Sequence, residues 1–267
     1  MTRLRRLDAE LVRRGLARSR QHAAELIDSG SVRVSGTTAT KAATQVDPAA
    51  AILVAADEGP TYASRGAHKL LGALAAFTPR GLIVEHRRCL DAGASTGGFT
   101  DVLLRAGAEH VIAVDVGYGQ LVWALQQDPR VTVLDRTNIR ELQPEQVAPA
   151  PQLVVGDLSF ISLTLVLPAL VRCTSPQADF VLMVKPQFEV GRERLGSGGV
   201  VRSPQLRVGA VLDVAAAAAN LGLGVAGVTA SPLPGPSGNV EYFLWLRAGA
   251  PPVDEGQVLA AVEQGPS

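Results

Sequence analysis

A glycine-rich turn constrains the fold of this chain more than any other stretch. The turn, DAGASTGGF at residues 91–99, follows the short apolar segment 88–90 and precedes TDVLLRAG, whose apolar residues have helical spacing. Glycines at 93, 97 and 98 allow the backbone to take dihedral angles that other residues avoid and to approach a ligand closely. The stretch therefore predicts a strand, a tight turn and a helix, the unit of an α/β sheet. A turn that only closes this unit, without binding a ligand, is the simpler alternative.

Two aspartates near this turn favour a ligand that carries a ribose. Asp91 ends the first strand, and Asp115 ends the next predicted strand, HVIAVD, where an open α/β sheet places a carboxylate against a ribose. The glycine spacing is G-x-x-x-G-G, which differs from the G-x-G-x-x-G spacing that holds a pyrophosphate at a helix N-terminus. A ribose without a pyrophosphate indicates S-adenosylmethionine rather than a dinucleotide.

Length and charge divide the chain into a basic end and a neutral body. The 267 residues are enough for one large domain and one small one, and the net charge is zero. Residues 1–46, however, hold nine Lys or Arg against four Asp or Glu. A basic module on a neutral body predicts a polyanionic partner, and a solvated basic face is the alternative.

The cysteines and the termini indicate a cytoplasmic protein. Cys89 and Cys173 lack metal-ligand or C-x-x-C spacing, so we expect two buried thiols in a reducing compartment and no metal site. The Arg-rich N-terminus has no apolar segment behind it that would make a secretory signal. We find no run of about 18 apolar residues that would span a membrane.

Hydrophobic periodicity predicts a small N-terminal α+β domain. Two helices at 5–15 and 19–30 are followed by strands in 31–36 and 50–55. We expect this domain to cover residues 1–58, with a linker at 59–64, a larger domain at 65–248 and a poorly ordered tail at 249–267 that has at most one short helix.

Strands and helices alternate through the larger domain. This order predicts a mostly parallel, Rossmann-like α/β sheet with helices on both faces and an antiparallel final strand. The predicted helices are 65–77, 97–106, 119–127, 161–172 and 204–221, and the predicted strands are 88–92, 110–115, 131–135, 152–157, 179–185, 223–229 and 240–247.

Four charged residues should meet at the carboxyl edge of this sheet, where ligands bind in such folds. Asp157 and Lys185 end two strands, Glu241 begins the antiparallel one, and Lys69 opens the helix before the first strand. Taken singly, each has an ordinary explanation, such as a cap, a surface acid or a lysine with its head in water. Two lysines and two acids beside a cofactor turn instead indicate a site in which a lysine serves as a base.

Several motifs are similar to those of one family. SRGAHKL, DAGASTGGFT, AVDVGYGQL, LDRTN, DLSFIS, VKPQFE and SPLPGPSGNVEYFLWL resemble the TlyA, or haemolysin A-like, ribosomal RNA 2′-O-methyltransferases, especially the actinobacterial branch, over residues 3–247. The N-terminal part resembles the ribosomal-protein-type RNA-binding domain, and the larger part resembles FtsJ-like methyltransferases. One departure is the segment GPTYA, where close relatives carry a basic-aromatic linker.

The resemblance implies an S-adenosylmethionine-dependent enzyme that methylates the 2′-hydroxyl of ribosomal RNA, at cytidine and on assembled subunits. It implies a catalytic tetrad of Lys69, Asp157, Lys185 and Glu241, in which Lys185 accepts the proton, Asp157 orients it and the other two position the ribose. The implied cofactor-binding residues are Asp91, Gly93, Ser95, Gly97, Phe99, Asp115, Asp135 and Asp157. The expected RNA-binding residues are Arg3, Arg5, Arg18, Arg20, Arg33 and Lys41. A membrane-active haemolysin-like protein and a nucleotide-dependent oxidoreductase are the alternatives.

Overall fold

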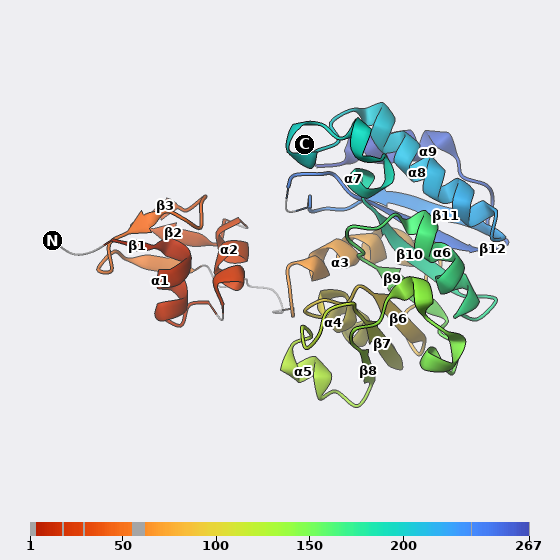
Figure 1. The fold of residues 1–267 in the computed structure, drawn as a ribbon, viewed down its shortest axis with the longest axis horizontal. Coiled ribbons are helices and arrows are strands. Elements are labelled where there is room, and N and C mark those ends of the chain that lie inside the picture. Colours follow the sequence, from red (N-terminus) through yellow and green to blue (C-terminus); the bar gives the residue numbers. More distant parts are fainter. Residues whose placement is uncertain (1–3, 18, 29, 55–61, 236, 267) are drawn as a thin grey trace. The chain divides into compact units, whose positions relative to one another are not determined.

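The computed structural model describes residues 4–17, 19–28, 30–54, 62–235 and 237–266. The chain forms two compact units, Met1–Thr61 and Tyr62–Ser267 (Figure 1). Each unit has a hydrophobic core of its own.

The N-terminal unit packs two helices against short antiparallel strands. Its elements are β1 (Arg5–Arg6), α1 (Leu7–Arg13), α2 (Arg20–Asp28), β2 (Val32–Val34), β3 (Thr37–Thr38), β4 (Gln45–Val46) and β5 (Ile52–Val54). Strands β3, β2 and β5 form one antiparallel sheet, and β1 pairs with β4. The helical spacing predicts that Leu7 and Leu11 meet Ala23, Leu26 and Ile27 in a shared apolar seam. In the structure all of these residues lie in the core except Leu26, which is only partly buried.

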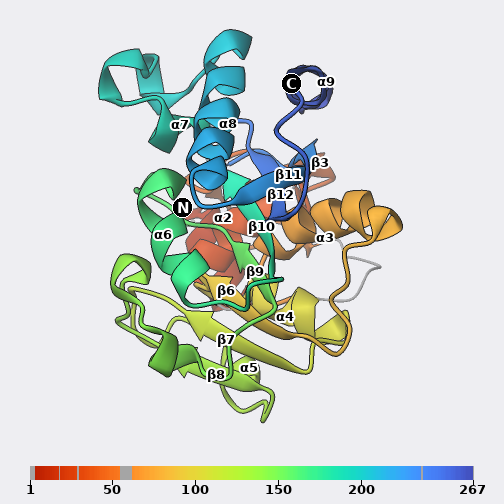
Figure 2. The same cartoon turned by 90° about the vertical axis from the view of Figure 1, so that its right-hand side faces the viewer.

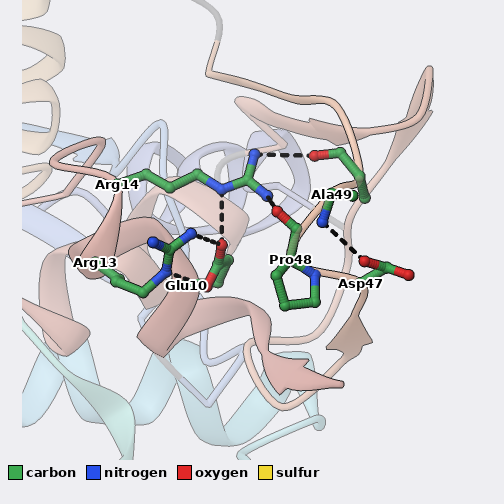
Figure 3. A network of polar contacts seen from close by, with 7 residues as sticks. Glu10, Arg13, Arg14, Asp47, Pro48 and Ala49 are labelled. Carbon is green, nitrogen blue, oxygen red and sulfur yellow. Dashed lines mark hydrogen bonds and ion pairs between the residues drawn. The ribbon is translucent and has the colours of Figure 1, made fainter. Parts of the chain in front are cut away.

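A buried carboxylate ties helix α1 to the segment before β5 (Figure 3). Glu10 accepts hydrogen bonds from Arg13 and Arg14, at 2.8 Å from each Nε. The Arg14 guanidinium also donates to the carbonyl oxygens of Pro48, at 2.7 Å, and Ala50, at 2.9 Å. Two of the basic residues that make this unit positive are therefore committed to its own structure.

The larger unit is an α/β domain built on a seven-stranded sheet with the order β11-β12-β10-β9-β6-β7-β8. Five strands are parallel from β10 to β8, and β12 lies antiparallel between β10 and β11. The strands are β6 (Arg88–Ala92), β7 (His110–Val114), β8 (Val131–Leu134), β9 (Leu153–Gly156), β10 (Asp179–Val184), β11 (Leu223–Ala230) and β12 (Tyr242–Ala248). The α/β fold and the antiparallel final strand are confirmed.

Helices cover both faces of this sheet. Successive side chains along each strand point to opposite faces, and each face packs into a core of its own. Figure 2 shows α3 and α6 on opposite sides of the strands. Residues of α3 and α4 pack with Cys89, Val111 and Val181, whereas residues of α6, α8 and α9 pack with Leu90 and Ile112. The helices are α3 (Gly66–Phe77), α4 (Gly98–Arg105), α5 (Trp123–Gln126), α6 (Leu163–Arg172), α7 (Pro186–Glu189), α8 (Pro204–Ala219) and α9 (Glu255–Gln264).

Several predicted segments differ in the structure. The helix expected at 5–15 begins only at Leu7, because Arg5 and Arg6 form β1 and pair with β4. The helix expected at 119–127 is reduced to α5, because Gly119 takes φ +63° and its amide is held by Asp135 Oδ2 at 2.9 Å. The tail at 249–267 is not a loose end: α9 packs on α8 and β11 and buries Val258, Ala261 and Val262. The prediction of a poorly ordered tail was wrong. The sequence gives little sign of the packing, because the apolar stripe of α9 is short and its partners α8 and β11 lie earlier in the chain.

None of the helices within the described ranges is long and apolar enough to cross a membrane.

The Glu10 network should make the stability of the N-terminal unit depend on pH. Hydrogen bonds from Arg13 and Arg14 lower the pKa of Glu10 from 4.5 to about 2. Because the folded pKa lies below the unfolded one, the ionised carboxylate stabilises the fold above about pH 4.5, and this contribution disappears as the pH falls toward 2. We expect Glu10→Gln to destabilise the unit near neutral pH and to flatten this dependence.

Urea titrations of the full chain at several pH values would test this, with the methyl NMR signals of Ile27 and Ile52 reporting on the core of the unit. The same acid dependence in the wild type and in Glu10→Gln would contradict it. Asp8, whose pKa is also lowered by Arg6 and Arg20, should account for a residual slope in the variant.

Candidate active site

Two lysines and two acids meet at one edge of the large sheet. Lys69 Nζ lies 2.6 Å from Glu241 Oε2 and 4.0 Å from Asp157 Oδ2, and Lys185 Nζ lies 2.5 Å from Asp157 Oδ1. Lys69, Lys185 and Glu241 are 8%, 7% and 1% exposed. We call Glu241, Lys69, Asp157 and Lys185 the tetrad. Burial and mutual pairing rule out the explanation of Lys69, Lys185 and Glu241 as ordinary surface residues, and Asp157, 22% exposed, lies within 4.0 Å of both lysines.

The choice of lysine in the tetrad is informative. Only three of the 25 Lys and Arg residues in this chain are lysines, namely Lys41, Lys69 and Lys185. A lysine ammonium can give up its proton in a protein, whereas an arginine guanidinium does not. Two of three lysines in one buried cluster therefore point to proton chemistry rather than to charge alone.

The strand pairing brings three tetrad residues to the same edge. Asp157 follows β9 and Lys185 follows β10, and these strands are parallel neighbours. Glu241 directly precedes β12, which runs antiparallel to β10 with Tyr242 opposite Val184. The start of an antiparallel strand lies at the end of its neighbour, so Glu241 comes beside Lys185.

Glycines set the position of the helix that carries Lys69. A Cβ at Gly72 of α3 would lie 2.6 Å from Pro232 Cδ, and a Cβ at Gly98 of α4 would lie 2.9 Å from the nitrogen of Ala67. Real Cβ atoms do not approach other atoms so closely, so a larger residue at Gly72 would force α3 and Pro232 apart, and one at Gly98 would force α3 and α4 apart. The backbone contacts of α3 therefore decide how far Lys69 reaches.

Glu241 needs a glycine as well. A Cβ at Gly235 would lie 2.6 Å from Glu241 Oε1. That oxygen is buried and has no hydrogen-bond partner among the described residues. The tetrad thus keeps one free acceptor beside the turn that leads into β12.

A cavity of 440 Å³ opens beside the tetrad at the ends of β6, β7 and β9. Its volume lies in the range of about 300–1,000 Å³ that is usual for small-molecule sites. It is lined by Gly93, Ser95, Val114, Asp115, Val116, Gln120, Thr137, Asn138, Ile139, Asp157, Leu158, Ser159, Phe160, Ile161 and Val166.

Four predicted cofactor residues line this cavity: Gly93, Ser95, Asp115 and Asp157. Asp115 accepts hydrogen bonds from the backbone nitrogens of Ser95, at 2.8 Å, and Gly117, at 2.7 Å. Gly93 has φ +86°, and a Cβ there would lie 3.1 Å from the carbonyl oxygen of Asp157. The glycine turn and the two aspartates thus form one wall of the cavity.

Four other predicted cofactor residues are not among the described residues that line the cavity. Phe99 packs against Phe243 in the core, with ring centroids 6.1 Å apart. Gly97 takes φ +100°, and a Cβ there would meet the side chains of Leu121 and Leu125. Asp135 Oδ2 accepts a hydrogen bond from the amide of Gly119. These residues support the core and the turns around the cavity, and their direct contact with a cofactor stays a prediction.

Asp91, the fourth of these residues, lies behind the glycine turn. It is 0% exposed, and its Oδ2 accepts a hydrogen bond from Thr100 Oγ1 at 2.7 Å. Burial raises the pKa of Asp91 to about 7, and the nearby charge of Asp157 acts in the same direction. Asp91 Oδ1 is buried with no partner in the described part of the chain, so the carboxyl group keeps one free acceptor.

Sequence reasoning missed several residues of the site. Ser159 Oγ lies 2.8 Å from Lys185 Nζ and lines the cavity. Gln120 accepts from Ser95 Oγ at 3.3 Å, and both Gln120 and Asn138 line the cavity. All three lie inside motifs already quoted, DLSFIS, AVDVGYGQL and LDRTN, but polar residues in turns carry no periodic signal that separates ligands from caps.

The predicted RNA-binding residues differ in their ion pairing. Arg5, Arg33 and Lys41 are exposed and form no ion pair with other described residues. Arg20 is paired with Asp8, at 2.9 Å, although its side chain is 61% exposed. Arg3 and Arg18 lie outside the described residues.

Residues 62–248 match the FtsJ-like methyltransferase model, and residues 5–52 match the S4 domain model. The chain belongs to the FtsJ-like methyltransferase family. It is therefore a methyltransferase with an N-terminal S4 domain, and the family decides against an oxidoreductase on the same sheet.

Individual relatives agree with the family. The chain is 63% identical over 247 residues, 92% of its own length and 91% of the relative, to a Mycobacterium tuberculosis protein described as 16S/23S rRNA (cytidine-2′-O)-methyltransferase TlyA. It is 36% identical to hemolysin A of Brachyspira hyodysenteriae, over 89% of this chain and 98% of that one. A solved structure of a Streptococcus thermophilus protein described as a hemolysin has a TM-score of 0.78 and 37% identity, and covers 99% of this chain and 96% of that chain.

Proposed function

We propose that this protein transfers the methyl group of S-adenosylmethionine to the ribose 2′-hydroxyl of a cytidine in ribosomal RNA, on an assembled ribosomal subunit. The observation that carries the proposal is the buried tetrad beside the cavity. The rRNA methyltransferase from Mycobacterium tuberculosis, at 63% identity, supports the substrate class. The S4 domain at residues 5–52 supports an RNA partner.

The residues of the cavity fit this cofactor. Asp115 has acceptor capacity left on both oxygens for ribose hydroxyls, since each now takes one backbone N–H. Gly93 and Ser95 would hold the methionine part, and Thr137 with Asn138 would meet the adenine edge in place of Asp135. The free acceptor of Asp91 supports a donor-bearing ligand near the turn. When bound, the cofactor supplies an electrophilic methyl group on a sulfonium.

The tetrad would prepare the 2′-hydroxyl for attack. A ribose hydroxyl is a weak nucleophile, so it needs a group that removes or polarises its proton. Lys185 would do this, held by Asp157, while Lys69 and Glu241 position the ribose. The four charges alternate along the cluster and sum to zero, so the site adds no net charge of its own. Fixed alignment of the reacting groups can supply roughly 7–11 kcal/mol.

Replacing Lys185 separates chemistry from binding. We expect Lys185→Ala to abolish methyl transfer while cofactor and ribosome binding stay near wild type. Lys185→Arg should fail too, because arginine keeps the charge but does not release a proton. The measurement is single-turnover methylation of ribosomal subunits at saturating cofactor. Substantial turnover by Lys185→Arg would mean that Lys185 supplies charge only.

Replacing Asp115 tests the cofactor site. Loss of a charge-assisted hydrogen bond costs about 1.5–3 kcal/mol, so Asp115→Ala should weaken S-adenosylmethionine binding about tenfold to a hundredfold in calorimetry. Asp135→Ala is the matched control, because Asp135 holds a neighbouring loop without lining the cavity. Equal losses in the two variants would indicate that the loops, and not a contact from Asp115, govern affinity.

Neutralising the free basic residues of the S4 domain tests the RNA partner. Phosphate contacts release counterions, so Arg33→Ala with Lys41→Ala should weaken ribosome binding and reduce its salt slope by about 1 per lost contact. Cofactor affinity should not change. Arg80→Ala with Arg130→Ala removes the same charge from the larger unit and serves as the control. If both pairs gave the same salt slope, the basic module would have no special part in docking.

A further inference from the structure

Two turns at the carboxyl edge of the sheet are joined along their length. One is the segment 157–162 after β9, and the other is the segment 185–189 after β10, which consists of Lys185 and the one-turn helix α7. At their first ends, Lys185 Nζ pairs with Asp157 Oδ1 at 2.5 Å and donates to Ser159 Oγ at 2.8 Å. We call these segments the Asp157 turn and the Lys185 turn.

The other ends of the two turns are joined by a second acid. Glu189 Oε2 accepts from Ser162 Oγ at 2.5 Å, and its Oε1 accepts from the backbone nitrogen of Leu163 at 2.9 Å. Between the Lys185 contacts and the Glu189 contacts, the ring centroids of Phe160 and Phe188 lie 5.3 Å apart. The three contacts follow the same order along both turns, so neither turn can shift without the other.

The contacts of Lys185 and Glu189 hold the backbone of Phe160 in a conformation that this residue would not keep by itself. Phe160 has φ +65°, in the left-handed region that aromatic residues avoid, and its side chain is 91% exposed. Such conformations persist where the surroundings determine them from both sides. The Asp157 turn is therefore shaped by Lys185 and Glu189, and the same contacts shape the surroundings of Lys185.

We propose that Ser159 and Glu189 are positioning residues for the tetrad: they fix the Lys185 ammonium and the Asp157 turn in one arrangement. The inference rests on the proposed function, because it assigns a purpose to the alignment of Lys185. At rest, the Lys185 ammonium donates to Ser159 Oγ at 2.8 Å and forms an ion pair with Asp157 Oδ1 at 2.5 Å. Once Lys185 gives up a proton, its two remaining N–H groups can stay with these partners, and the lone pair then has a defined direction, toward the 2′-hydroxyl. Glu189 keeps Ser159 in place through the far end of the same turn.

The first test observes the ammonium directly, without activity. With 15N-labelled lysine, only three side-chain signals exist, and Lys185→Ala assigns the one of interest. A buried, hydrogen-bonded ammonium exchanges its protons slowly and is visible at low temperature. We expect Ser159→Ala to broaden or remove the Lys185 signal and to leave that of Lys69 unchanged. Ser159→Thr should keep it, because the hydroxyl remains and the exposed side chain leaves room for a methyl group.

The second test separates positioning from binding and from folding. Ser159→Ala should lower kcat at least tenfold, with the RNA KM and the cofactor Kd within about threefold of wild type, since misplacement by about 1 Å can cost a hundredfold in rate. Ser159→Thr should restore most of kcat. Ser175→Ala, near the opposite edge of the sheet, is the matched control and should match the wild type.

Glu189→Gln tests the far joint. It keeps an acceptor for the Leu163 amide but changes the contact with Ser162, so we expect a smaller fall in kcat in the same direction and faster hydrogen exchange in the peptide that covers residues 157–163. An unchanged Lys185 signal together with wild-type kcat in Ser159→Ala would overturn the inference. If the wild type itself did not methylate ribosomal RNA, the proposed function would fail, while the lysine signal and the hydrogen exchange would still decide whether these residues hold the ammonium.

Discussion

Two ammonium groups are buried at the carboxyl edge of the sheet, and the rest of the site depends on how they are neutralised. A buried charge is tolerated only when it is paired and hydrogen-bonded. Lys69 forms an ion pair with Glu241, and its Nζ lies 4.0 Å from Asp157 Oδ2. Lys185 forms an ion pair with Asp157 and donates a hydrogen bond to Ser159. Because the carboxylates alternate with the ammonium groups, removal of any member leaves a buried charge without its partner. This requirement links one helix and three strands that are far apart in the sequence.

The position of β12 meets this requirement. Lying antiparallel between β10 and β11, it starts at the edge where the parallel strands end. Glu241 is thereby delivered beside Lys69, and Gly235 leaves the space that its carboxylate needs. At the ends of β6 and β7, the glycine turn and Asp115 line the cavity. One sheet edge therefore carries both the tetrad and the cavity.

The N-terminal unit uses charge in another way. Buried Glu10 and Asp8 engage four of its arginines: Arg6, Arg13, Arg14 and Arg20. These pairs contribute to the fold of a unit with a small core, as small domains require. Among the described basic residues of this unit, Arg5, Arg33 and Lys41 are exposed and form no ion pair. They are the residues that remain available to contact phosphates. A count of charges along the sequence overstates the surface that RNA can meet.

The sequence by itself determined the α/β class, the strand and helix order and the four residues of the tetrad. Periodicity and glycine turns are local signals, and residues at the ends of parallel strands must share an edge whatever the details of packing. The sequence could not show which of the predicted cofactor residues line the cavity: Asp91, Gly97, Phe99 and Asp135 lie in the same motifs as Gly93 and Asp115, but they are not among the described residues that line it. Nor did it identify Ser159, the ordered helix α9 or the arginines committed to Glu10. Those outcomes depend largely on contacts between segments distant in the sequence, such as Ser159 with Lys185 and Phe99 with Phe243, or on which side of a turn an atom faces. Only tertiary packing decides them, because burial and pairing are properties of the assembled neighbours and not of the residue type.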